Sequence, residues 1–90
     1  MNTLKIGRFT WKVEISDSCE EAESDDLGLC IWDDKLIWVR STQSERQILI
    51  TLVHEIFHAM AYSYDLKLGH PVINKLQSPI ADLIRKNKLL

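Results

Sequence analysis

The sequence has little of several features that mark other classes of protein. Its 90 residues are too few for two separate hydrophobic cores, so we expect one domain spanning residues 1–90. The formal net charge is only −2, and no basic stripe is present, so nucleic acid is not an expected partner. No apolar run is long enough to cross a bilayer, so we expect no membrane partner either.

The sequence also lacks a recognisable targeting segment and has few cysteines. The first ten residues carry Lys5, Gly7 and Arg8 and no apolar stretch, so we expect no signal peptide and a cytoplasmic location. The only cysteines are Cys19 and Cys30, which fit that compartment as reduced thiols. A disulfide between them is the alternative. Nothing in the sequence indicates an oligomeric state.

The beginning of the chain is predicted to form a β-strand. From Leu4 to Ile15 apolar and polar residues alternate, with a break in phase near Gly7 that indicates a bulge or a later start. Six of the ten residues in the segment 17–26 are acidic. We expect this segment to be a solvated loop. A second cation site is the alternative, although the segment lacks the glycine and ligand spacing of a calcium loop.

Residues 27–41 are predicted to form a β-hairpin. Two short apolar runs, 29–32 and 36–39, flank the turn residues Asp33, Asp34 and Lys35. Both runs are apolar at successive positions, which indicates strands covered on both faces. The tryptophans are predicted to pack in the core or at its rim. They are Trp11, Trp32 and Trp38.

The second half of the chain is predicted to be helical. Residues 42–45 have the capping-box pattern, with Thr42 as N-cap and Glu45 reaching back, and the helix should run to about Tyr64.

A second helix should follow a bend at Gly69, with Pro71 at its first helical position. Its apolar spacing continues to the C-terminus but is interrupted by Pro79. We therefore expect a kink there, or a restart capped by Ser78.

Residues 54–58 read His-Glu-Ile-Phe-His, the HExxH pattern. Residues four apart on an α-helix lie about 40° apart around its axis, so the imidazoles of His54 and His58 can converge on one metal ion. Glu55, about 100° round from His54, can reach the open coordination side as a general base toward an activated water. The pattern therefore predicts a Zn²⁺ site with two histidine ligands and Glu55 as a catalytic residue.

The remainder of this helix strengthens the metal-site hypothesis. Its apolar residues spread over about 200° of the circumference, which is typical of a buried helix. Unpaired polar groups in such a position cost roughly 1–3 kcal/mol each, and a metal site would satisfy them together. Hydrogen-bonded core histidines are the alternative. The polar seam consists of Gln47, Thr51, His54, Glu55, His58, Tyr62 and Asp65.

A zinc site of this kind needs a third protein ligand, and no glutamate follows His58. We favour His70, because the chain can fold back over the seam after the Gly69 bend. Asp65 lies about 10 Å along the helix axis from His58, which is too far for the same ion. The candidates considered are Asp65, His70, Asn74 and Asp82, with Cys30 as a more distant one.

Other seam residues have predicted supporting roles. Tyr62, one turn beyond His58, could donate a hydrogen bond to a developing oxyanion, although packing is its alternative role. Thr51 and Asp65 are candidates for orienting the imidazoles. A peptide substrate would lie extended along an edge strand of the hairpin.

With its hairpin before and its second helix after, the motif His54-Glu55-x-x-His58 resembles the zincin superfamily. It is most similar to the small single-domain minigluzincins, which include short phage-type metallopeptidase-like proteins. The resemblance covers roughly Gly28 to Asn87. It implies an α+β fold in which a small antiparallel sheet of about three strands packs on the HExxH helix and on a C-terminal backing helix that supplies the third ligand. In gluzincins that ligand is a glutamate, whereas the matching region here offers His70.

The resemblance implies a zinc-dependent peptidase that acts on a peptide or protein. Two alternatives remain open at this point. The chain could be a catalytically inert zinc-binding scaffold, such as a regulatory or phage accessory module. It could also hydrolyse an amide or ester that is not a peptide.

Overall fold

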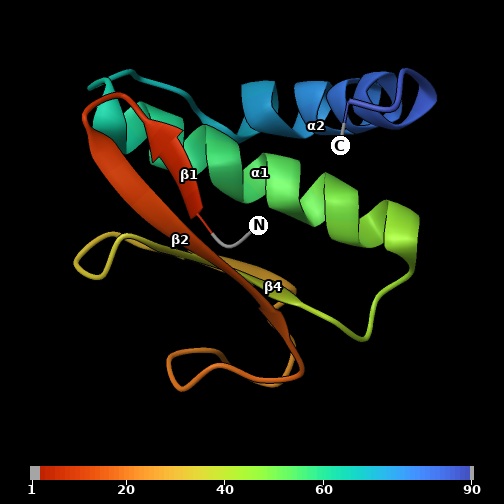
Figure 1. The fold of residues 1–90 in the computed structure, drawn as a ribbon, viewed down its shortest axis with the longest axis horizontal. Helices are drawn as coiled ribbons and strands as arrows, with labels where there is room; N and C mark the ends of the chain where they lie inside the picture. Colours follow the sequence, from red (N-terminus) through yellow and green to blue (C-terminus); the bar gives the residue numbers. More distant parts are fainter. Residues whose placement is uncertain (1–2, 90) are drawn as a thin grey trace.

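The chain forms a small sheet, a long helix packed on that sheet, and a second helix packed on the first. The computed structural model describes residues 3–89. The elements are β1 (Thr3–Ile6), β2 (Phe9–Ser16), β3 (Gly28–Ile31), β4 (Leu36–Arg40), α1 (Glu45–Ser63) and α2 (His70–Lys86). Figure 1 shows α1 between the sheet and α2. The predicted α+β class, with a small sheet packed on helices, is confirmed.

The sheet has four strands in the order β1-β2-β4-β3 and is mixed. Its outer pairs, β1 with β2 and β3 with β4, are antiparallel, whereas the central pair β2 and β4 is parallel. The resemblance to zincins had implied a small antiparallel sheet of about three strands. The difference arises because the long loop 17–27 carries the chain past the position beside β2. Strand β3 therefore forms an edge, and the hairpin places β4 in the centre.

The predicted single strand from Leu4 to Ile15 is wrong, because two strands occupy this region. Ile6 pairs with Phe9, so Gly7 and Arg8 form a two-residue hairpin turn. Gly7 has a φ of 62°, a conformation that glycine adopts without steric cost at the first central position of such a turn. The break in phase near Gly7 was thus the signal of a turn and not of a bulge.

The predicted hairpin of β3 and β4 is confirmed. Ile37 and Val39 of β4 belong to the core that contacts α1, and Trp38 points to the opposite face. Trp38 is fully buried there, with the guanidinium of Arg40 5.0 Å from its ring centroid. Strand β4 is therefore covered on both faces, as its continuous apolar run indicated.

The tryptophans divide into two groups. Trp11 and Trp38 are fully buried, as predicted, whereas Trp32 is 53% exposed. Trp32 follows β3 at the start of the hairpin turn, where no further strand covers it.

Residues 17–27 form an acidic loop whose backbone is held by hydrogen bonds from one arginine side chain. The guanidinium of Arg40 donates hydrogen bonds to the carbonyl oxygens of Asp17, Glu23 and Asp26. One arginine thus fixes three points of a loop without regular structure. Cys19 and Cys30 are free thiols, so the alternative of a disulfide between them does not hold.

Helix α1 begins later than the capping-box pattern indicated. Its N-cap is Ser44 and not Thr42, because the Ser44 hydroxyl accepts a hydrogen bond from the backbone N–H of Gln47. Ser44 and Gln47 themselves have the spacing of a capping box, which explains why two registers compete in the sequence. The helix ends at Ser63, one residue before the predicted end.

Helix α2 begins at His70, so Pro71 is its second residue and not its first as predicted, and the helix does not break at Pro79. Gly69 is its N-cap, Pro71 lies in its first turn, and the helix runs through Pro79 to Lys86. The proline leaves the carbonyl of Lys75 without an intrahelical donor. Lys75 and Pro79 are both exposed, so water can satisfy that carbonyl and no restart at Ser78 is needed.

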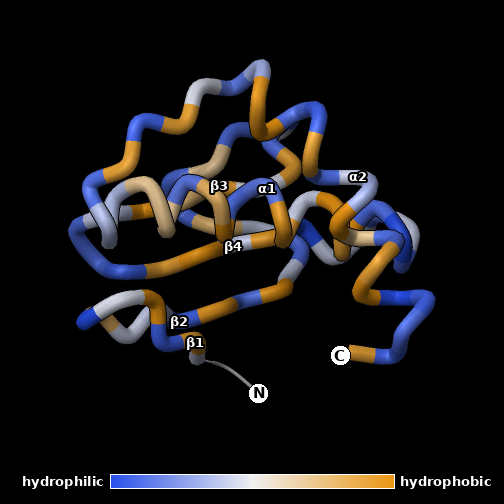
Figure 2. Tube along the Cα trace, turned by 90° about the horizontal axis from the view of Figure 1, so that it is seen from above, coloured by the Kyte–Doolittle hydropathy of each residue, from blue (hydrophilic) through white to orange (hydrophobic). Residues whose placement is uncertain are grey.

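Two apolar clusters hold α1 from opposite sides. The sheet-side cluster includes Trp11, Ile37 and Val39, and the other joins Ile50 and Val53 to α2. Figure 2 shows the hydrophobic stretch of β4 beside α1. Because both sides of the helix are buried, only its polar seam remains to face a cleft. Among the described residues, no helix has the length and apolar character needed to span a membrane.

Gly28 at the start of β3 permits the closest approach between the sheet and α1. A Cβ at this position would lie 2.6 Å from Cγ2 of Thr51, 3.1 Å from Oε2 of Glu55 and 3.1 Å from the carbonyl oxygen of Trp38. The first of these distances is below ordinary van der Waals contact. Any side chain at position 28 would therefore push α1 away from the strand.

We expect Gly28→Ala to lower the free energy of unfolding by about 1–3 kcal/mol, the usual cost of an overpacked core. Urea denaturation followed by circular dichroism measures this loss. Gly69→Ala is the matched control, because its nearest contact would be Pro71 Cδ at 3.5 Å, and only a weak N-cap preference of about 0.5 kcal/mol is lost. Equal losses in the two variants would contradict the proposed close contact.

Candidate metal centre

Three histidine side chains converge on one point beside α1. His54 and His58 come from consecutive turns of α1, and His70 is the first residue of α2. Nε2 of His58 lies 3.2 Å from Nε2 of His54 and 3.1 Å from Nε2 of His70. In residues 3–89 this is the one group of three or more histidine, cysteine or acidic side chains whose ligand atoms lie within 4.8 Å of one another. The acidic loop therefore provides no second cluster of this kind.

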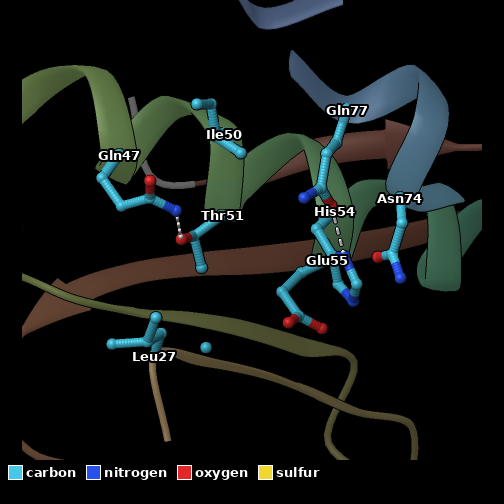
Figure 3. A pocket seen from close by; sticks show the side chains of 9 residues that line it. Leu27, Gln47, Ile50, Thr51, His54, Glu55, Asn74 and Gln77 are labelled. Carbon is cyan, nitrogen blue, oxygen red and sulfur yellow. Dashed lines mark hydrogen bonds between the residues drawn. The ribbon is translucent and has the colours of Figure 1, made fainter. Parts of the chain in front are cut away.

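A fourth side chain fixes the tautomer of one histidine. Nδ1 of His54 lies 2.6 Å from Oε1 of Gln77 on α2, as Figure 3 shows. An amide oxygen only accepts hydrogen bonds, so Nδ1 of His54 carries the proton and its Nε2 presents a lone pair. Imidazoles that bind metal commonly donate their other N–H in this way.

The protons of three neutral imidazoles cannot satisfy both short contacts of His58. If Nε2 of His58 carries a proton, it can donate a hydrogen bond to only one of its two neighbours. If Nε2 carries no proton, its lone pair faces the lone pair of His54 Nε2. Burial lowers the pKa of His58, and the neighbouring His54 and His70 act in the same direction. The lowered pKa favours the neutral imidazole of His58, which presents a lone pair to a cation when its Nε2 is unprotonated.

The spacing of the nitrogens fits zinc. Two nitrogens bound tetrahedrally at about 2.0–2.1 Å from Zn²⁺ lie about 3.3 Å from each other. The contacts of 3.1 and 3.2 Å at His58 are close to this value. Three histidines would leave a fourth position open, as in catalytic rather than structural zinc sites.

Glu55 lies beside this cluster as a buried carboxylate. The residue is 7% exposed, and its side chain extends from α1 toward the strands (Figure 3). Its Oε2 would lie 3.1 Å from a Cβ added at Gly28. Burial raises the pKa of Glu55 to about 7, and the negative charge of Asp26 contributes. Within residues 3–89 no group donates a hydrogen bond to this carboxylate, so both oxygens are available to a proton. A carboxylate with these properties suits a general base near neutral pH.

A groove runs between β3 and the histidines. Its volume is about 330 Å³, and its walls bring Cys30 and Trp32 opposite Glu55 and the three histidines. A second cavity of about 230 Å³ adjoins it at Gly28, and this one is lined largely by polar side chains. The seam of α1 therefore faces open space on the side where a substrate could enter.

The structure does not bring the other candidate ligands into the cluster. Asp65 follows the end of α1 with a φ of 53° and is exposed. Asp82 pairs with Arg46 at 3.3 Å, and Asn74 lines the polar cavity without a hydrogen bond to a histidine. Cys30 lies in the groove, where burial, together with the charge of Glu55, raises the pKa of its thiol to about 12.

The predicted supporting residues also lie elsewhere. The hydroxyl of Thr51 donates to Oε1 of Gln43 and not to a histidine. The Tyr62 hydroxyl lies 3.5 Å from Nζ of Lys35, and its ring packs among aromatic side chains. The oxyanion role of Tyr62 stays a prediction without a contact to support it.

Sequence reasoning missed Gln77, the residue that orients His54. A signal was available, because Gln77 is seven residues after His70 and therefore lies on the same face of α2 two turns later. Once His70 is taken as a ligand, the neighbouring positions on that face become candidates for contacts to the same cluster.

Comparison with known proteins does not identify a family. No protein-family model, no curated protein and no solved structure matches this chain.

We expect the purified protein to bind about one zinc ion per chain and His70→Ala to weaken that binding strongly, because one of three nitrogen ligands is lost. Competition with a chromophoric chelator measures the affinity. Gln77→Ala should give an intermediate loss of about 10–100-fold, as expected for a residue that orients a ligand.

Asn74→Ala is the matched control, since Asn74 belongs to α2 and lines the cavity beside His54 without a hydrogen bond to a histidine. Its zinc affinity should equal that of the wild type. Normal zinc binding by His70→Ala would contradict the three-histidine site.

Proposed function

We propose that this chain is a zinc-dependent hydrolase that cleaves peptide bonds, with His54, His58 and His70 as ligands and Glu55 as general base. The observation that carries the proposal is the convergence of three Nε2 atoms beside a buried carboxylate to which no group in residues 3–89 donates a hydrogen bond. A structural zinc site would not require that carboxylate. The proposed class is the zincin type of metallopeptidase, acting in the cytoplasm.

The metal, Glu55 and Gln77 would each have a distinct role in hydrolysis. When bound, zinc would lower the pKa of a coordinated water toward about 7 and polarise a substrate carbonyl. Glu55 would accept the proton of that water and deliver it to the leaving amine. Gln77 would hold the His54 ring in the orientation that points Nε2 toward the ion.

The edge strand β3 offers a place for the substrate backbone. The carbonyl oxygen of Leu27 accepts from the N–H of Arg40, so by antiparallel alternation Leu29 and Ile31 direct their backbone groups toward β4. The N–H and C=O groups of Gly28 and Cys30 therefore point away from the sheet. An extended peptide could pair with them and pass in front of the histidines.

The direct test of turnover is Glu55→Gln. This change keeps the size of the side chain and removes its basicity, so hydrolysis of an unfolded protein or peptide library should fall by roughly 10²–10⁴-fold. Zinc content and melting temperature should stay close to those of the wild type, because Glu55 is not a ligand. The exposed Glu45 at the start of α1 gives the matched control, Glu45→Gln, which should retain full activity.

Two outcomes would contradict the proposal in different ways. Zinc binding without turnover in the wild type, across peptides and simple esters, would indicate an inert scaffold. Loss of zinc in Glu55→Gln would mean that Glu55 holds the ion or its ligands, and the proposed general base would have to be abandoned.

A further inference from the structure

A large cavity adjoins the metal centre on the side away from Gly28. Its volume is about 660 Å³, and it lies between the turn of β1 and β2, the start of the β3–β4 turn and the end of α1. Trp32 and His58 line both this cavity and the groove that contains the histidines. The cavity therefore lies next to the site at which hydrolysis is proposed.

Aromatic rings form one wall of this cavity. The ring centroids of Trp32 and Tyr62 are 5.3 Å apart at an interplanar angle of 32°, and the two side chains are 53% and 40% exposed. Phe9 adds a third ring, 5.7 Å from that of Tyr62. Contiguous exposed apolar side chains of this kind usually mark a binding surface.

The aromatic wall is rigidly supported from behind. Tyr62 packs edge-on against the fully buried Trp11 at 6.0 Å. Nζ of Lys35 lies 4.8 Å from the Tyr62 ring and donates to the carbonyl oxygen of Trp32 at 2.7 Å. These contacts hold both exposed rings in place before any ligand arrives, which lowers the entropic cost of binding.

We propose that this cavity binds a large aromatic side chain of the peptide substrate, on the His58 side of the metal centre. The inference rests on the proposed function, because it takes a peptide as the ligand. A peptide paired with β3 would run from Gly28 toward Trp32, and every second side chain would project to the same face. One of those side chains would then enter the cavity beside His58.

The chemistry of the lining favours an aromatic over a charged side chain. Arg8 and Asp65, which line the cavity, carry opposite charges. The nearby ammonium of Lys35 already donates to the carbonyl oxygen of Trp32 and lies against the Tyr62 ring. Leu66 and Leu68 add apolar side chains to the lining of the cavity. A planar ring can stack on Trp32 and Tyr62 with an offset, a geometry that adds to the free energy of apolar burial.

The test compares peptides that differ at one position, with Phe, Ala or Glu, in the zinc-loaded protein. We expect kcat/KM for the Phe peptide to exceed that for the Ala peptide by about 10–100-fold, the usual value of filling an apolar pocket. Trp32→Ala should remove most of this preference. Val72→Ala, which truncates an exposed apolar residue of α2 outside the cavity, should leave it intact.

Tyr62→Phe separates side-chain binding from the oxyanion role predicted from sequence. The variant keeps the ring and loses the hydroxyl. Under the proposal it should keep the preference for Phe over Ala. A preference that vanishes in Tyr62→Phe would contradict the stacking role of this ring.

A binding experiment distinguishes failure of this proposal from failure of the proposed function. The chemical shifts of the Trp32 indole N–H and the Tyr62 amide are followed while N-acetyl-phenylalanine amide or N-acetyl-alanine amide is added to the metal-free protein. Saturable shifts with the phenylalanine amide alone would support the cavity even if no turnover were found. Turnover without any preference for aromatic peptides, or equal shifts with both amides, would overturn the cavity assignment and leave the hydrolase proposal standing.

Discussion

The contact between Gly28 and the polar seam of α1 is the constraint on which the centre depends. With no Cβ at position 28, Thr51 and Glu55 approach the backbone of β3 within the space that a methyl group would fill. That approach buries the Glu55 carboxylate and raises its pKa toward neutrality. It also places the free edge of β3 beside the histidines. The sheet thus raises the proton affinity of Glu55 and, under the proposed function, would also set the path of a peptide substrate.

Helix α2 supplies the second half of the centre from the opposite side. It packs on the apolar face of α1 through the cluster of Ile50, Val53 and Ala81. The same packing brings His70 and Gln77 to the seam, one as a predicted ligand and the other as the partner of His54. Because one helix carries both residues, a small shift of α2 would alter ligand position and ligand orientation together.

Local patterns in the sequence predicted the parts of the fold that depend on neighbouring residues. The HExxH spacing, the β3–β4 hairpin and the return of His70 to the seam follow from helical and strand periodicity and from one glycine bend. The parallel pairing of β2 with β4 could not be read this way, because strand order is decided by contacts between distant segments. The interruption expected at Pro79 could not be judged from the sequence for a related reason. Whether a proline interrupts a helix depends on the exposure of the carbonyl one turn earlier.

Zinc K-edge X-ray absorption on the zinc-loaded protein tests the central claim most directly. The account predicts three nitrogen ligands and one oxygen at about 2.0–2.1 Å, with one nitrogen fewer in His70→Ala. A sulfur ligand at about 2.3 Å would instead place Cys30 on the ion and close the position that hydrolysis requires. A spectrum that does not change in His70→Ala would equally contradict a centre built from both helices.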